Sequence, residues 1–407
     1  MTSFRLGLAL ASLTACASTV GSATPPDSDS GVAPDLPLLD APSLDRPVVV
    51  DVSPRDVVTA DRPQPVVPVR IWAGHFQSAA LMSDGSLRAW GSNNFGELGD
   101  GTAMRVVTRP ERVPLDEVAQ VAIQGYSVFA RTRDGSVFAW GQNRNGELGL
   151  GSSNNDVLRP TRIEGLDGVV DLAANCALLR DATARCWGYN FNGQVGDGTI
   201  EPRPRPVAVL GVTNATAVSR GCARIADGTL RCWGYNSAGE VGDGTTEQRP
   251  VPATVLGLSD VSAVYSGVTH RCAVRADASL WCWGENGSGA LGVGGATDRA
   301  APTRVSGIVD VRHVALGLNH SCAVTADETV WCWGDGAYGQ LGLGGSTNRF
   351  TLSRVPGLTG VVEVAAGHFH SCARRRDGEV YCWGSGQYGQ LGDGENAFRF
   401  VPQRVAF

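Results

Sequence analysis

Short alternating runs of apolar residues fill the chain from residue 69 to its end, and none of them keeps a helical period. β-Branched and aromatic residues are frequent in these runs, and glycine and aspartate separate them. Runs of this length and composition predict β-strands. The Asp377-Gly378 pair between two of the runs is typical of a hairpin turn. The last 50 residues are therefore expected to form four strands, at 361–365, 371–375, 379–383 and 402–405.

A twelve-residue segment that begins with Trp-Gly occurs seven times without gaps, and the tryptophans are 50, 47, 46, 50, 50 and 50 residues apart. Four strands in each of seven units predict an all-β fold, a seven-bladed β-propeller with four short antiparallel strands per blade over residues 69–407. A solenoid-like stack is the alternative, but a stack needs polar caps and the last unit is of ordinary length and sequence. The segments are WGSNNFGELGDG (90–101), WGQNRNGELGLG (140–151), WGYNFNGQVGDG (187–198), WGYNSAGEVGDG (233–244), WGENGSGALGVG (283–294), WGDGAYGQLGLG (333–344) and WGSGQYGQLGDG (383–394).

Ten of the 11 cysteines form five pairs in which the two members are ten residues apart. A three-residue hairpin loop between them places both on one face of neighbouring strands, within the reach of a disulfide. Units 1 and 2 lack both cysteines and have Ala79/Ala89 and Phe129/Ala139 instead. Three units replace the turn glycine by alanine or glutamate, so we expect no strict need for a left-handed residue there. The predicted disulfides are Cys176–Cys186, Cys222–Cys232, Cys272–Cys282, Cys322–Cys332 and Cys372–Cys382.

Metal binding is the other interpretation of these cysteines, because His270, His320 and His370 each lie two residues before one of them. Zinc sites favour a CxxC spacing, and cysteines ten apart across a hairpin suit a disulfide better. We therefore predict disulfides, no metal site and an oxidising compartment.

The N-terminus has the layout of an export signal, with one positive charge before an apolar run that is too short to span a membrane. Its sequence LTAC (13–16) resembles the bacterial lipobox, in which the leader is cut before the cysteine. We predict that residues 1–15 are a lipoprotein signal peptide and that Cys16 is the lipidation site. An ordinary signal peptide cut after Ala17 or Ala23 is the alternative.

Residues 17–68 contain ten of the 21 prolines and eight aspartates, a composition that cannot build a packed core. We predict a disordered Pro/Asp-rich tether over 16–68, and a tail without a role is the alternative. The predicted location is the cell envelope, after export, with the lipid anchor as the only membrane contact. Ala17 stands where an aspartate resembles an inner-membrane retention signal in some bacteria, so the outer membrane is favoured.

All 34 basic residues are arginines, and the formal net charge is −6. This balance argues against a nucleic-acid binder, and the lack of lysine excludes Schiff-base chemistry and a P-loop. Catalysis needs a unique constellation, whereas the glutamates and glutamines of this chain recur from unit to unit. We therefore predict no enzymatic activity, no cofactor and a monomer. The recurring residues are interpreted as internal polar groups, at positions 97, 147, 194, 240, 340 and 390.

Positions that vary between units within the WGxNxxG loop are the candidate binding residues. Equivalent loops of equivalent blades lie on one rim, and aromatic and arginine side chains are enriched in binding hot spots. Partial burial against the next blade is the alternative. The candidate rim consists of Phe95, Arg144, Tyr189, Phe191, Tyr235, Tyr338 and Tyr388.

The Trp-Gly segment, the GxxHSCA sequence before it and the PxxV sequence after it together resemble the regulator of chromosome condensation repeat family. This resemblance covers all seven units and implies a seven-bladed propeller. The family's eponymous member is a nucleotide-exchange factor for a Ran-type GTPase that acts through a loop wedge in one blade. No unit here exceeds the 50-residue spacing, so no exchange residue is carried over.

Bacterial relatives in this family include a secreted β-lactamase-inhibitory protein that binds its enzyme with one propeller face, so the resemblance implies protein binding. We predict a non-catalytic, envelope-tethered module that binds a protein or a glycan. The alternatives are a regulator similar to the guanine-nucleotide exchange factors and a hydrolase that uses one propeller face.

Overall fold

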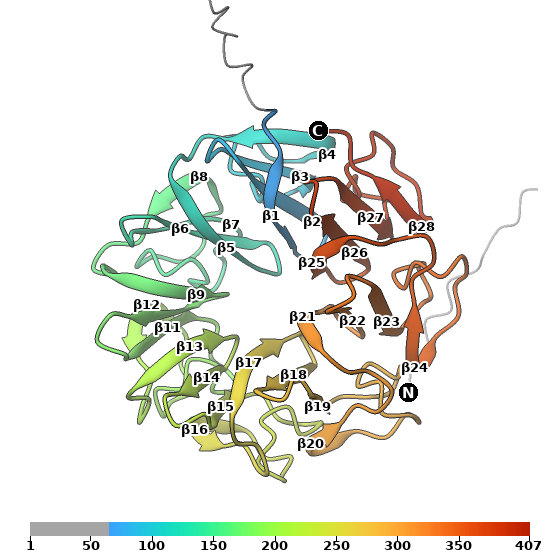
Figure 1. Cartoon of the computed structure of the whole chain (residues 1–407). Helices are drawn as coiled ribbons and strands as arrows, with labels where there is room; N and C mark the ends of the chain where they lie inside the picture. The colour runs from blue at the N-terminus through green and yellow to red at the C-terminus, as the bar shows by residue number, and fades with distance from the viewer. Residues whose placement is uncertain (1–64) are drawn as a thin grey trace, which may run out of the picture. The chain divides into compact units, whose positions relative to one another are not determined.

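The computed structural model describes residues 65–407, which lie in the compact unit Pro63–Phe407. Seven four-stranded antiparallel sheets surround a central axis in this unit (Figure 1), and residues 65–407 contain no helix. The predicted all-β, seven-bladed propeller is confirmed. The predicted signal peptide (1–15), Cys16 and the predicted tether (16–68), apart from its last four residues, lie outside the described residues. The first strand begins at Pro68, one residue before the predicted start of the propeller.

Each blade takes four consecutive strands, which follow one another from the axis to the rim (Figure 1). Blade 1 contains β1 (Pro68–Ala73), β2 (Gln77–Met82), β3 (Leu87–Asn93) and β4 (Arg105–Val113). Blade 2 contains β5 (Val118–Gln124), β6 (Ser127–Thr132), β7 (Val137–Gly141) and β8 (Val157–Arg162). Blade 3 contains β9 (Val169–Ala173), β10 (Cys176–Leu179), β11 (Ala184–Gly188) and β12 (Arg203–Ala208). Blade 4 contains β13 (Ala215–Ser219), β14 (Cys222–Ile225), β15 (Leu230–Gly234) and β16 (Arg249–Thr254).

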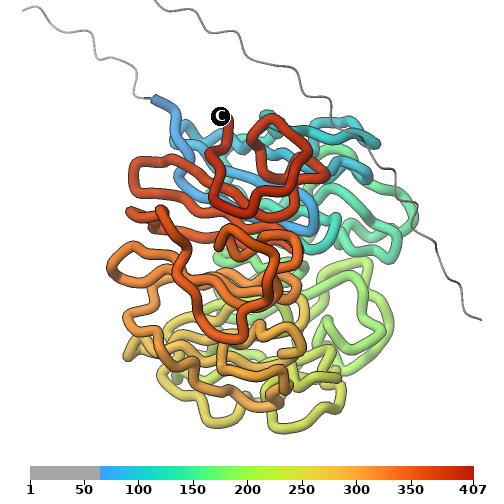
Figure 2. Tube along the Cα trace, turned by 90° about the vertical axis from the view of Figure 1, so that its right-hand side faces the viewer, coloured from blue at the N-terminus to red at the C-terminus, as the bar shows by residue number. Residues whose placement is uncertain are grey.

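The last three blades have the same arrangement. Blade 5 contains β17 (Val261–Ser266), β18 (His270–Arg275), β19 (Leu280–Gly284) and β20 (Arg299–Arg304). Blade 6 contains β21 (Val311–Leu316), β22 (His320–Thr325), β23 (Val330–Gly334) and β24 (Arg349–Arg354). Blade 7 contains β25 (Val361–Ala366), β26 (His370–Arg375), β27 (Val380–Gly384) and β28 (Arg399–Arg404). No strand is exchanged between the first and the last blade, which lie side by side (Figure 2). Contacts between the two blades therefore close the ring, among them backbone hydrogen bonds from Gly394 N to Thr108 O (2.9 Å) and from His368 N to Gly74 O (3.2 Å).

The repeated tryptophan joins each blade to the one before it. All seven indoles are at most 1% exposed, and in six of them Nε1 donates a hydrogen bond to a backbone oxygen of the preceding blade. The glycine two residues after that oxygen lies against the indole; a Cβ added to Gly342 would lie 2.8 Å from Nε1 of Trp383. The bonds run from Trp90 to Gln390 (2.9 Å), Trp140 to Glu97 (2.8 Å), Trp233 to Gln194 (2.9 Å), Trp283 to Glu240 (2.9 Å), Trp333 to Ala290 (2.8 Å) and Trp383 to Gln340 (2.8 Å).

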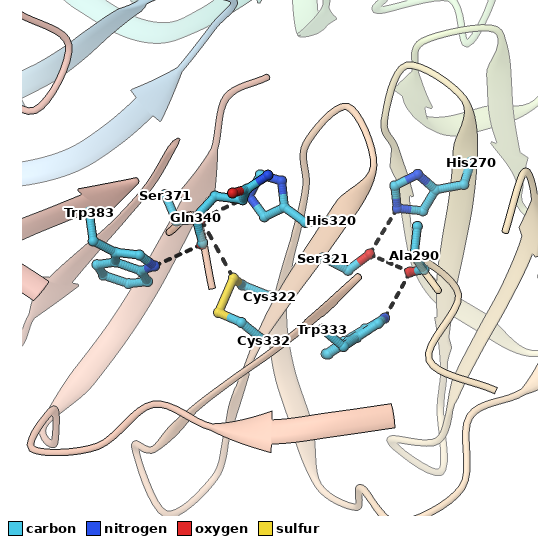
Figure 3. The surroundings of a disulfide bond; sticks show 10 residues. All are labelled: His270, Ala290, His320, Ser321, Cys322, Cys332, Trp333, Gln340, Ser371 and Trp383. Atoms are coloured by element: carbon cyan, nitrogen blue, oxygen red, sulfur yellow. Dashed lines mark hydrogen bonds between the residues drawn. A yellow bond between two sulfur atoms is a disulfide. The ribbon is translucent and has the colours of Figure 1, made fainter. Parts of the chain in front are cut away.

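Three buried histidines add a second link across blades 5, 6, 7 and 1. In each link a histidine Nε2 lies 2.8–2.9 Å from a serine hydroxyl of the next blade, which itself donates to the oxygen that accepts the indole. Figure 3 shows the links of His270 and His320. Because the hydroxyl O–H donates a hydrogen bond to that oxygen, the hydroxyl accepts a hydrogen bond from the histidine Nε2–H. Burial lowers the pKa of His270 to about 4 and that of His320 and His370 to about 3, so all three are neutral near pH 7. The pairs are His270–Ser321, His320–Ser371 and His370–Ser78.

All five cysteine pairs are joined as disulfides, with 4.1 Å between the Cα atoms of each pair. In blade 7, Cys372 lies directly opposite Cys382, and the loop closes with a bond from Gly378 N to Arg375 O (3.0 Å). This is the predicted register, with three residues in the loop. The sulfurs are therefore not free to bind a metal, and the neighbouring histidines bind serine hydroxyls.

One expectation about this turn is wrong. The three residues that replace its glycine are left-handed, with φ of 63° at Ala182, 59° at Ala278 and 62° at Glu328. The backbone N–H of each donates to the carbonyl three residues earlier, for example from Ala278 to Arg275 (2.9 Å). Closing the loop with this bond requires the left-handed conformation whatever the side chain, at a cost of roughly 1–2 kcal/mol for a residue with a Cβ.

Candidate binding surface

One face of the propeller carries two sets of connections, and we call it the loop face. The first set comprises the inner hairpins, which join the first and second strands of each blade. The second set comprises the WGxNxxG loops, which follow the third strands. The sets touch, since the rings of Phe76 and Tyr388 are 4.6 Å apart and those of Phe369 and Tyr338 are 5.0 Å apart. The Asp-Gly turns lie at the other ends of the second and third strands.

The seven candidate rim residues all belong to the WGxNxxG loops of the loop face. Arg144 is exposed, and Phe95 is half-buried beneath it, with 5.0 Å between the guanidinium carbon and the ring centre. The other five keep 36–52% of their surface exposed and are therefore accessible to a partner. These five are Tyr189, Phe191, Tyr235, Tyr338 and Tyr388.

The recurring glutamates and glutamines support the tips of these loops. Each accepts a hydrogen bond from the backbone N–H two residues earlier, as when Glu97 binds Phe95 N (2.7 Å) and Gln340 binds Tyr338 N (2.8 Å). Burial raises the pKa of Glu97 to about 7. The prediction of internal polar groups is confirmed at positions 97, 240, 340 and 390, which are buried, whereas Glu147 and Gln194 are half-buried. All six fix the backbone that presents the variable side chains. The same bond occurs at Glu147, Gln194, Glu240 and Gln390.

The inner hairpins add aromatic residues that sequence reasoning missed. His75 lies 3.8 Å from His368, 4.0 Å from Phe76 and 4.7 Å from Tyr126, measured between ring centres. Together with three candidate rim residues they form a continuous group across blades 6, 7, 1 and 2, which we call the aromatic arc. Its members are Phe95, Tyr126, His75, Phe76, Tyr388, His368, Phe369 and Tyr338.

A sequence signal for these residues was available. They occupy the two variable positions of the GxxH sequence, which reads GHFQ in unit 1, GYS in unit 2 and GHFH in unit 7. Burial lowers the pKa of His75 to about 4 and that of His368 to about 3, so the stacked imidazoles are uncharged near pH 7. The aromatic arc is therefore a neutral surface.

Blades 3 and 4, which do not contribute to the aromatic arc, differ from the other blades in their inner hairpins. Their inner hairpins are shorter, so Ala173 pairs directly with Cys176, whereas in blade 5 Tyr265 pairs with Cys272. This shortening explains the tryptophan spacings of 47 and 46 residues. It leaves two cavities, of about 230 and 190 Å³. We call them the Arg220 hollow, since both are lined by Gln124, Asn175, Arg220 and Val268.

The hollow borders the axial channel, a cavity of about 350 Å³ that Gln124, Arg220 and Val268 also line. Charged groups of the channel are mostly paired: Glu363 bonds to Arg70 (2.8 Å) and to Arg374 (2.9 Å). Within residues 65–407, no group of three or more His, Cys, Asp or Glu side chains is arranged to hold a metal ion. The same part of the chain has no helix long and apolar enough to cross a membrane.

Comparison with family models matches the regulator of chromosome condensation (RCC1) repeat at residues 134–176, 227–274, 277–324, 327–374 and 377–407, more than half of the chain. A second model of the same repeat matches residues 311–340 and 361–390. The chain belongs to the regulator of chromosome condensation repeat family. A search of curated proteins by sequence finds no match.

Solved structures of this family's fold are similar over most of the chain. Yeast Prp20, in a crystal structure with Kap60, gives a TM-score of 0.70 at 22% identity, covering 89% of this chain and 91% of the other. Prp20p from Saccharomyces cerevisiae in a second crystal structure also gives 0.70 at 22% identity, covering 85% and 87%. Human WBSCR16 gives 0.69 at 22% identity, covering 79% and 95%. These likenesses support the propeller fold.

On the loop face, residues shared by all repeats and residues that differ between repeats have different roles. Residues that are the same in every repeat, such as the tryptophan and its covering glycine, hold blades together. Residues that differ between repeats form the aromatic arc, the exposed rim and the Arg220 hollow. The loop face is thus a constant scaffold with a unit-specific surface.

Proposed function

We propose that this chain is a non-catalytic interaction module that binds a partner protein through the loop face. The observation that carries the proposal is the aromatic arc, continued by the exposed Tyr189, Phe191 and Tyr235. Tyrosine and phenylalanine offer a large contact area with few rotatable bonds, so little conformational entropy is lost when they bind.

Rigidity of the scaffold supports this proposal. Disulfides brace the hairpins within five of the blades, tryptophan bonds and histidine–serine links join neighbouring blades, and the glutamates and glutamines hold the loop tips. A surface that is already ordered before it binds loses less freedom on association. Propellers of the same fold bind proteins: yeast Prp20 has been crystallised with Kap60, and Prp20p is described as binding Gsp1p and histones.

An exchange-factor activity has less support. It would rest on the likeness to Prp20 at 22% identity, and no unit of this chain carries an insertion beyond the 50-residue spacing. A hydrolase activity also has less support, because the two unit-specific carboxylates that line the axial channel are already bonded within residues 65–407, Asp171 to Gln120 and Val218 N and Glu363 to Arg70 and Arg374.

The module is proposed to act outside the cytoplasm. Five disulfides are typical of an oxidising compartment, in agreement with the export signal and the lipobox-like sequence at 13–16. We propose that Cys16 is acylated and that the chain is held at the cell envelope, on the outer membrane. Mass spectrometry of the mature protein should find an acylated Cys16 at the N-terminus, and Cys16→Ser should release the protein from membranes. An uncut or unacylated terminus would contradict the anchor.

Partner binding is tested by a triple variant, Tyr235→Ala, Tyr338→Ala and Tyr388→Ala. Partner capture from envelope extract should fall at least 100-fold, because each side chain is an exposed hot-spot type. The matched control changes the same three residues to phenylalanine, which keeps the rings and should keep capture within several-fold. Melting temperatures of both variants must stay near the parent value. Unchanged capture by the alanine variant would refute the proposal.

A further inference from the structure

The Arg220 hollow is a unit-specific part of the loop face, formed where blades 3 and 4 differ from the other blades. Arg220 stands two residues before the first cysteine of unit 4, where units 5, 6 and 7 have histidine. Those histidines are buried and bind the next blade. Because the hairpin of blade 4 is short, Arg220 is instead half-buried and lines both cavities of the hollow and the axial channel.

Other charges in the channel are satisfied, but Arg220 is not. Glu363 is bound by two arginines, and Asp171 accepts hydrogen bonds from Gln120 (2.9 Å) and Val218 N (3.0 Å). Within residues 65–407 the Arg220 side chain has no ion pair and no hydrogen bond, and burial alone accounts for its lowered pKa. A half-buried guanidinium with five unused donors favours an anionic ligand.

A second arginine also lines the hollow. Arg271 is 8% exposed and lines the smaller cavity. Its terminal nitrogens donate to the backbone oxygens of Glu240 and Arg220, while its Nε has no partner. The nearby Glu240 carboxyl accepts the backbone N–H of Ala238 (2.9 Å), and burial raises its pKa. Each cavity also has one carboxyl on its wall, Glu147 in the larger and Glu240 in the smaller; each accepts a backbone N–H of its own loop tip, and neither forms an ion pair with Arg220 within residues 65–407.

We propose that the Arg220 hollow binds a carboxylate group on an acidic segment of the partner protein. The inference rests on the proposed protein-binding function and names the chemistry of one contact. Cavities of about 230 and 190 Å³ are smaller than the roughly 300–1,000 Å³ of typical cofactor sites and suit a single side chain. A carboxylate can accept two parallel bonds from one guanidinium, which gives orientation as well as affinity. The neighbouring aromatic arc would hold the apolar part of the same partner.

Titration of the purified disulfide-bonded chain with a fluorescein-labelled tetraglutamate peptide tests this inference. Binding should weaken at least tenfold in Arg220→Gln, because a half-buried charge-assisted pair is lost. The matched control is Arg349→Gln, which removes an exposed arginine that forms no ion pair within residues 65–407 and should change binding less than twofold. Arg220→Ser is the second variant, since unit 2 has Ser127 at the equivalent position.

Several outcomes of the titration would reject carboxylate binding in the Arg220 hollow. No binding to the parent chain at millimolar peptide, or equal losses in the Arg220 and Arg349 variants, would overturn the inference. Succinate that binds as tightly as the peptide would also overturn it, since the site would then hold a free dicarboxylate. The labelled peptide does not need the partner protein. A failed titration with tyrosine-dependent capture intact would therefore reject the hollow and leave the proposed function standing.

Discussion

The three buried histidines predict a marked loss of stability in mild acid. In the folded chain, burial holds the pKa of His270, His320 and His370 at about 3–4. In the unfolded chain each should titrate near its ordinary value of about 6.5. Below pH 6.5 the unfolded state therefore binds more protons than the folded state. Stability is present above that pH and is lost as the pH falls toward the folded pKa values.

The size of the effect follows from these values. One pKa unit corresponds to about 1.4 kcal/mol, so at pH 5 each histidine lowers the free energy of unfolding by about 2 kcal/mol. Three of them together contribute about 6 kcal/mol, a large share of the ~5–15 kcal/mol of a typical domain. Glu97 acts in the opposite direction, because burial raises its pKa to about 7 in the folded state. It is common to parent and variant and cancels when they are compared.

The comparison uses a variant with His270→Gln, His320→Gln and His370→Gln. Glutamine is the residue that unit 1 has at this position, as Gln77. Guanidinium unfolding, followed by tryptophan fluorescence without reductant, should be measured at pH 8, 7, 6 and 5. The parent should lose about 6 kcal/mol more than the variant between pH 8 and pH 5. Equal pH dependence in the two proteins would refute the account of the histidines.

Two further predictions concern the scaffold. In blade 1, Ala79 pairs with Ala89 at the position that a disulfide takes in blades 3 to 7. The double variant Ala79→Cys with Ala89→Cys should therefore form a sixth disulfide and raise the free energy of unfolding by about 2 kcal/mol. A free-thiol assay and thermal unfolding check this, and two titratable thiols in the oxidised protein would contradict it. Gly342→Ala should destabilise by about 3 kcal/mol, because its Cβ would lie 2.8 Å from the neighbouring indole at a φ of 70°. Gly344→Ala, at a φ of 83° with nothing within 4 Å, should cost only about 1 kcal/mol, and equal losses would argue against the indole contact.

Much of the fold could be predicted because the sequence of one blade is repeated seven times. The count of Trp-Gly segments fixes the number of blades, and the spacing of ten residues between cysteines fixes the parity of the hairpin. Each of these features depends on residues that are close in sequence. The number of blades and the register of each hairpin could therefore be predicted from the sequence pattern.

Features that depend on contacts between blades could not be predicted in the same way. The links His270–Ser321 and His370–Ser78 join residues 51 and 292 positions apart, and no local period reports them. The left-handed turn at Ala278 was missed because composition alone suggested a permissive position. Irregular tryptophan spacings did mark blades 3 and 4, but only coordinates relate the shortening to an unpaired arginine in a cavity.

The central claim is that the loop face recognises a partner protein. Site-specific photo-cross-linking in native cells tests it most directly, with benzoylphenylalanine placed at Tyr338 or Tyr388 on the loop face and at the exposed Ala276 or Ala326 in the turns between second and third strands, at the far strand ends. The account predicts one discrete cross-linked protein from both loop-face positions and none from the turns. Cross-links from the turns alone, or equal labelling from all four positions, would contradict it.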